Sequence, residues 1–152
     1  MTIRSTYGTR LLASIALAVL LTLAVFPQVG AAAARQKVIG TAVSNGFRVQ
    51  VTAIRVPEAG AAPDAATVRI AAFRRAGDSW NRLGSALTVG QRAGWFWNVV
   101  TGRYGIRSLT LAQPGGRYPI RVALKLLVSP SIGPSATFRF IVDQGRLVQV
   151  DV

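Results

Sequence analysis

The sequence predicts an all-β chain: an antiparallel β-sandwich of the immunoglobulin-like type, with eight or nine short strands, behind an N-terminal signal helix. Three observations favour this fold class. Turn signals recur at short and regular spacing, apolar and polar residues alternate between the turns, and no helical period is found after residue 34. We therefore expect one β-sandwich domain over residues 35–152.

The N-terminal segment carries the features of a secretory signal. Leu11 to Phe26 is a run of 16 uncharged residues that follows Arg4 and Arg10, and a proline and four alanines come behind it. A bilayer-spanning helix needs about 20 apolar residues, so this run is short for a permanent anchor. We expect residues 1–34 to be removed and the protein to be secreted, either outside the cell or in its envelope. Membrane contact is expected only through this segment if it stays uncleaved.

The first half of residues 35–152 reads as strands joined by turns. Ser44-Asn45-Gly46 is a hairpin turn signal, since Asn-Gly tolerates the positive φ angles of a tight turn. Near Ala53 the apolar phase switches, as a bulge or a crossing between sheets would cause. Gly84 divides two short strands or bends a single kinked one. The predicted strands are 37–43, 47–56, 68–73, 78–89, 95–101, 106–111, 120–128, 136–142 and 147–152.

The second half contains the most regular pattern. Ile120, Val122, Leu124 and Leu126 alternate with a mixed outer face, and residues 136–142 repeat the same period. The last strand carries three valines on one face, so we expect the terminus to be tied into a sheet. As an edge strand it could pair with a partner or with a second copy, although a monomer is the favoured state.

The charge balance favours an anionic partner. Residues 35–152 hold all five acidic residues and 16 of the 18 basic ones, which leaves a net charge of +11. Such a charge suits an anionic glycan, a wall polymer or an acidic surface, and secretion argues against nucleic acid. The alternative is a compositional background rich in Ala, Gly and Arg. Five basic residues alternate with apolar ones and would form one basic sheet face if their strands are neighbours: Arg48, Arg69, Arg121, Arg139 and Lys125.

Several chemistries have no residues to carry them. The chain has no histidine and no cysteine, which removes the commonest general base, the commonest metal ligand and all thiol chemistry. No glycine-rich phosphate loop or acidic calcium loop is found, so we expect no cofactor, no metal and no catalytic residue. A carboxylate-dependent hydrolase is the remaining enzyme class, and it would require folding to bring Asp64 and Asp78 together.

Gly94-Trp95-Phe96-Trp97 is the candidate binding stretch. On the predicted strand Trp95 and Trp97 share one face and Phe96 lies on the other, so both faces are apolar. One interpretation places the tryptophans in the core; the other exposes an aromatic strip that stacks on sugar rings or fills a partner's pocket. Arginines lie before and after the strip. The candidate binding residues are Trp95, Phe96, Trp97, Arg92, Arg103 and Arg107.

These observations predict a secreted, non-catalytic binding module for an anionic glycan or cell-wall polymer. Two alternatives stay open. One is a protein-interaction module, an inhibitor or accessory subunit that acts through a loop or an edge strand on an extracellular protein. The other is the carboxylate-dependent hydrolase.

Overall fold

The computed structural model describes residues 35–57, 63–113 and 119–150. Contacts within the chain divide it into residues 1–30 and residues 31–152, and all described residues belong to the second unit. The predicted signal segment and its cleavage site lie outside the described residues, as do residues 114–118 and the last two residues of the chain. Within the described ranges, no helix is long and apolar enough to span a bilayer.

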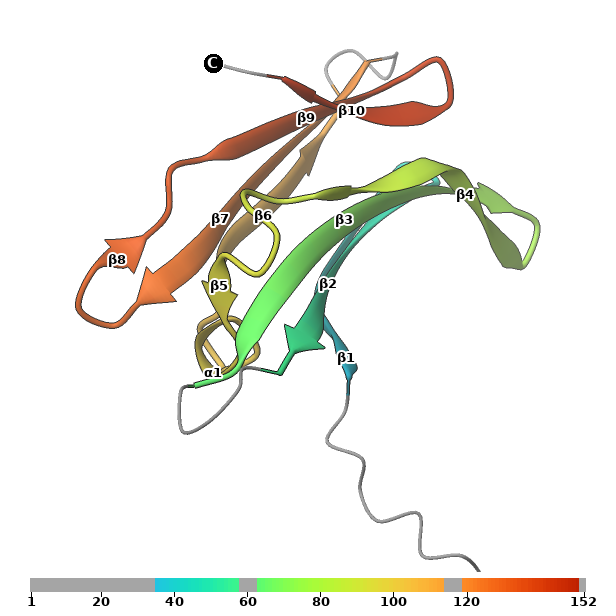
Figure 1. Ribbon diagram of the computed structural model, residues 1–152. Helices are drawn as coiled ribbons and strands as arrows, with labels where there is room; N and C mark the ends of the chain where they lie inside the picture. Colours follow the sequence, from blue (N-terminus) through green and yellow to red (C-terminus); the bar gives the residue numbers. More distant parts are fainter. Residues whose placement is uncertain (1–34, 58–62, 114–118, 151–152) are drawn as a thin grey trace, which may run out of the picture. The chain divides into compact units, whose positions relative to one another are not determined.

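One sheet contains the first half of the described chain. It consists of β1 (Gln36–Ser44), β2 (Phe47–Val56), β3 (Ala65–Ala76) and β4 (Ser79–Thr88) in that spatial order, and β5 (Trp95–Phe96) pairs with the start of β3 (Figure 1). Every pairing is antiparallel, and β2 lies against β3 without a register break from Phe47↔Arg74 to Val56↔Ala65. We call this sheet A.

The other sheet contains the second half. Its spatial order is β10 (Arg146–Val150), β9 (Phe138–Asp143), β7 (Ile120–Ser129) and β6 (Ile106–Ala112), with β8 (Gly133–Pro134) paired to β7. We call this sheet B. Its edge strand β6 contacts β1 of sheet A, and its other edge strand β10 contacts β4. The predictions of an all-β chain and of antiparallel strands are confirmed.

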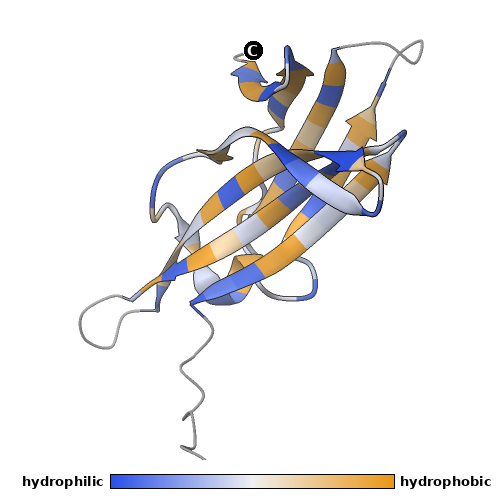
Figure 2. Ribbon diagram, turned by 90° about the vertical axis from the view of Figure 1, so that its right-hand side faces the viewer, coloured by the Kyte–Doolittle hydropathy of each residue, from blue (hydrophilic) through white to orange (hydrophobic). Residues whose placement is uncertain are grey.

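A single hydrophobic core cluster draws on the inward faces of both sheets. Along β2 and β7 every second residue is buried, and Figure 2 shows the corresponding alternation of hydrophobic and hydrophilic residues along the strands. This alternation follows from the two-residue period of a strand, which sends successive side chains to opposite faces. The cluster includes Val49, Val51, Val68, Ile70, Ile120, Val122, Leu124, Leu126, Phe140 and Val142.

The predicted hairpin turn after β1 is confirmed. Asn45 has φ 46° and Gly46 has φ 77°, the two positive angles of a type I′ turn. The turn between β9 and β10 has the same character, with Gln144 at φ 46° and Gly145 at φ 76°. The pairing of β10 with β9 also confirms that residues 146–150 are tied into a sheet.

The kinked strand around Gly84 is confirmed, and a register shift also lies beside the predicted phase switch in β2. Gly84 has φ 65°, and the pairing of β3 with β4 shifts between Ile70↔Leu87 and Ala72↔Leu83. The pairing of β2 with β3 is continuous, whereas its pairing with β1 shifts between Val38↔Thr52 and Gly40↔Val51, which places an irregularity in β1 next to the predicted switch. Ile54 lines a hollow on the outward face of sheet A.

The strand predicted over 95–101 is wrong beyond Phe96. Trp97–Val100 forms one helical turn, α1, closed by Thr101, whose backbone N–H and side-chain hydroxyl both donate to the Trp97 carbonyl at 3.0 and 2.7 Å. Residues 95–100 are apolar except for Asn98, so the run has no alternating period that would distinguish a strand from a helical turn. Trp97 and Val99 therefore do not share a strand face with Trp95.

Candidate functional site

Trp95 is an internal side chain. Only 8% of its surface is exposed, and its indole nitrogen donates a hydrogen bond to the Val89 carbonyl oxygen at 2.9 Å. Its ring meets the Phe138 ring edge to face, with centroids 5.9 Å apart, a favoured arrangement for an aromatic pair. Trp95 therefore joins the β4–β5 connection to sheet B, and it is not available as a stacking surface for a ligand.

Trp97 is held at the start of α1 by contacts to two other elements. Its backbone N–H donates to the carbonyl of Asp64 at 2.9 Å, and Arg55 lies over its ring at 5.9 Å from the centroid. Arg55 also forms an ion pair with the Asp64 side chain. These contacts connect three parts of the chain: β2 through Arg55, the start of β3 through Asp64, and α1 through Trp97. Each of the three residues therefore has a structural role.

The other predicted site residues do not gather around the tryptophans. Arg92 is exposed in the loop before β5, and Arg107 is exposed on β6 at a register shift against β7. Arg103 follows α1 and lies over the Tyr104 ring at 5.4 Å. Phe96 is the exposed member of the aromatic stretch, with 48% of its surface accessible. The cation over Trp97 comes from Arg55, which the sequence pattern did not select.

The five outward basic residues do not form one face. Arg48 and Arg69 lie on the neighbouring strands β2 and β3 of sheet A, whereas Arg121, Lys125 and Arg139 lie on β7 and β9 of sheet B. The condition for one basic sheet face, that all the strands carrying these residues are neighbours, is therefore not met. The strands that carry these residues belong to two sheets, and each sheet has its own basic outer face.

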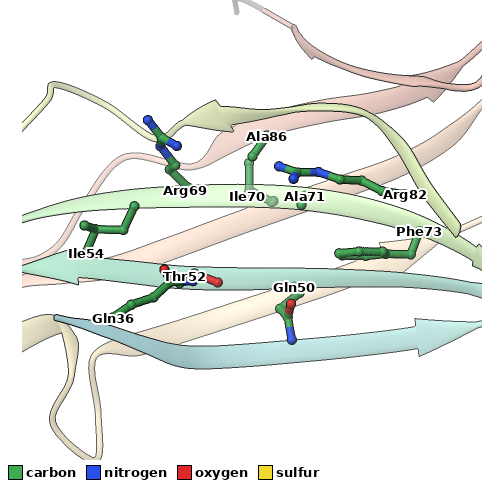
Figure 3. A pocket seen from close by; sticks show the side chains of 10 residues that line it. All are labelled: Gln36, Gln50, Thr52, Ile54, Arg69, Ile70, Ala71, Phe73, Arg82 and Ala86. Carbon is green, nitrogen blue, oxygen red and sulfur yellow. The ribbon is translucent and has the colours of Figure 1, made fainter. Parts of the chain in front are cut away.

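The outer face of sheet A contains a hollow of about 260 Å³, which we call the polar hollow. Arg69 on β3 and Arg82 on β4 lie along one side of it, and Gln50 and Thr52 on β2 lie on the other side of β3 (Figure 3). The complete lining is Gln36, Gln50, Thr52, Ile54, Arg69, Ile70, Ala71, Phe73, Arg82 and Ala86.

The polar hollow is formed by a small residue beside an irregular strand. Ala71 has a short side chain on the outward face of β3, opposite Gln50 on β2. On its other side the register shift places Gly84 to Ala86 opposite this single residue. The bulge leaves no long side chain directly beside Ala71 on β4, so a depression remains between Arg69 and Arg82.

The lining has the chemistry of a site for a hydroxylated anion. Two exposed guanidinium groups donate hydrogen bonds to carboxylate or phosphate oxygens, and the amides of Gln36 and Gln50 and the hydroxyl of Thr52 can exchange hydrogen bonds with hydroxyl groups. None of the ten lining residues is acidic. Figure 3 shows Arg82 extending along β3 toward Ala86, on the same side of the hollow as Arg69.

Sheet B offers a different outer surface. A depression of about 560 Å³ crosses its strands, and it is lined mainly by apolar atoms of residues such as Ala123, Ile141 and Val150, with Arg121 and Arg139 at its border. It contains two cations but only one neutral hydrogen-bonding side chain, Thr110. The polar hollow is therefore the better candidate for a ligand rich in hydroxyl groups.

The acidic residues that folding would have to bring together remain apart. Asp64 directly precedes the first residue of β3, and Asp78 lies two residues beyond its last residue. A strand of 12 residues lies between them, which separates them along the strand by roughly 40 Å at about 3.3 Å per residue. In the part of the chain that the structure describes, no three His, Cys, Asp or Glu residues are grouped so as to hold a metal ion.

Sequence reasoning found Arg69 as an outward residue but missed Arg82, Gln36, Gln50, Thr52 and Phe73 as members of a common site. The period of each strand could show which side chains point outward. It could not show that β1 to β4 are neighbours, or that β4 bulges opposite Ala71.

Comparison of the chain with protein families, with curated proteins and with solved structures found no match.

Proposed function

We propose that residues 35–152 form a secreted, non-catalytic β-sandwich of the immunoglobulin-like type that binds an anionic glycan or cell-wall polymer through the polar hollow. The observation that carries this proposal is the lining of the hollow. Arg69 and Arg82 supply positive charge beside three neutral hydrogen-bonding side chains, and no acid opposes them. The net charge of +11 over residues 35–152 would add long-range attraction for such a polymer.

The protein-interaction module is the second candidate. The apolar depression on sheet B favours it, because exposed Val148 and Val150 on β10 adjoin that surface and apolar patches of this kind are used in protein contacts. Binding there would depend on apolar area, so it would tolerate high salt. Salt sensitivity therefore separates the two candidates.

The test is binding of the protein, as cells process and export it, to isolated cell-wall material and to soluble polygalacturonate. Each measurement is made at about 0.01 M and about 1 M salt, where the Debye length falls from about 30 Å to about 3 Å. We expect binding at low salt and release at high salt. Replacing both Arg69 and Arg82 with Gln should weaken low-salt binding by about 100-fold or more, since each charged hydrogen bond contributes about 1.5–3 kcal/mol.

Two double variants serve as controls because each removes the same charge elsewhere. Arg92→Gln with Arg107→Gln alters the predicted aromatic strip, and Arg121→Gln with Arg139→Gln alters sheet B. An equal loss in all three variants would mean that only net charge matters. Loss confined to the first control would place the site at Arg92 or Arg107 and not at the polar hollow. Absence of binding to either material at low salt would overturn the proposal.

A further inference from the structure

The polar hollow continues into a second cationic feature at the hairpin end of sheet A. Arg48 on β2 pairs with Phe73 on β3, and Phe73 pairs with Arg82 on β4. Phe73 therefore stands between the two arginines in one row across three strands, and it also lines the hollow. A ligand that fills the hollow lies next to the row that contains Arg48.

The guanidinium of Arg48 lies over two aromatic rings. Its central carbon lies 4.6 Å from the Phe73 ring centroid and 4.8 Å from that of Trp80. Stacking of this kind holds a guanidinium in one orientation and removes water from its faces. We call Arg48, Phe73 and Trp80 the arginine clamp.

Arg48 lacks an anionic partner within the protein's described residues. Its Nε is buried and has no hydrogen-bond acceptor there, and no carboxylate forms an ion pair with it. A buried donor of a charged group without an acceptor is unfavourable, and structures normally supply one. Nε itself is closed to solvent, so a ligand oxyanion would accept hydrogen bonds from the terminal Nη atoms of this partly buried side chain, which has no carboxylate partner among the described residues.

We infer that the ligand is a linear, hydroxyl-bearing polyanion with one carboxylate or phosphate per repeat, and that it places one anionic group in the polar hollow and another on the arginine clamp. This inference rests on the proposed function. Two linked contacts make the second one effectively intramolecular, so affinity should rise steeply when the ligand becomes long enough to reach both. A single repeat unit can occupy the hollow alone.

The test measures binding of the exported protein to galacturonic acid and to its oligomers of increasing length by titration calorimetry. We expect affinity to rise by roughly 100-fold between one unit and the shortest oligomer that spans both places. Arg48→Lys keeps the charge but removes the planar fork, so it should abolish this gain and leave single-unit binding unchanged. Arg121→Lys, the same replacement on sheet B, should leave both unchanged.

Two further measurements keep the inference testable if Arg48→Lys destabilises the fold. In the first, Trp80→Leu removes one ring of the arginine clamp and should also reduce the length-dependent gain. In the second, inorganic polyphosphate replaces the oligomer; it has charges but no hydroxyl groups, so it should bind more weakly than an oligomer of equal charge. Single-unit binding without a length-dependent gain would overturn this inference and leave the proposed function standing. If Arg82→Gln abolishes single-unit binding but Arg48→Lys does not change the length-dependent gain, this inference is likewise overturned and the proposed function stands. Absence of all binding would overturn the proposed function itself.

Discussion

The indole nitrogen of Trp95 donates to the carbonyl oxygen of Val89 at 2.9 Å, deep inside the protein, where both residues are buried. The most conspicuous aromatic residue of the predicted binding strip is thus part of the fold. It follows that a loss of binding in a Trp95 variant would report unfolding. The substitutions that test binding must lie elsewhere.

Trp95→Phe should destabilise the protein without a specific effect on ligand binding. The phenyl ring keeps most of the apolar contact with Phe138 but leaves the Val89 carbonyl without its donor, and a buried unpaired group costs about 1–3 kcal/mol. Urea denaturation measures this loss. Phe96→Leu, at an exposed position of the same strand, is the control and should change the free energy of unfolding by about 0.5 kcal/mol or less.

Gly105→Ala should destabilise the protein because no space exists for a side chain. A methyl group there would overlap the carbonyl oxygen of Val100 and lie 2.8 Å from its Cα, and these are backbone atoms that cannot rotate away. Overpacking of this kind costs about 1–3 kcal/mol. Thermal denaturation measures it. An unchanged melting temperature would show that α1 and the following turn can move apart freely.

Ala71→Leu should block the polar hollow while the fold is retained. The residue lies outward on β3 at the centre of the depression, so a larger side chain would fill the space between Arg69 and Arg82. We expect binding of an anionic oligomer to weaken by about tenfold or more, equivalent to about 1.4 kcal/mol, with little change in the urea midpoint.

The matched control for Ala71→Leu is Ala123→Leu. Ala123 is also an outward alanine, on β7 of sheet B, and it lines the apolar depression there. This variant should bind the oligomer as the parent protein does. If Ala123→Leu weakens binding and Ala71→Leu does not, the ligand site lies on sheet B.

Gly46→Ala should destabilise the first hairpin through the backbone alone. Gly46 has φ 77°, and a methyl group added there would meet no atom within 4 Å. The cost of a left-handed conformation for a residue with a Cβ is about 1–2 kcal/mol. Asn45→Gly, at the neighbouring position with φ 46°, should be nearly neutral. Equal effects of the two variants on the free energy of unfolding would contradict a conformational cause.

By itself the sequence determined the strands, the turns and the direction of most side chains. The alternation of Ile120 to Leu126 predicted a strand with one buried face, and Asn45-Gly46 predicted the hairpin between β1 and β2. Both signals depend only on local backbone geometry. The absence of histidine and cysteine likewise limits the available chemistry, because no arrangement of the chain can supply an imidazole or a thiol that its composition lacks.

Only the tertiary structure decided which residues share a surface. Arg69 and Arg82 belong to different strands, and their common hollow depends on the pairing of β3 with β4 and on the bulge opposite Ala71. The positions of Trp95 and Trp97 also depend on tertiary contacts, because Trp95 donates a hydrogen bond to the Val89 carbonyl and the Trp97 N–H donates to the Asp64 carbonyl. Strand order, register shifts and the positions of backbone acceptors arise from contacts between residues distant in sequence. The alternation of apolar and polar residues within one strand therefore cannot predict them.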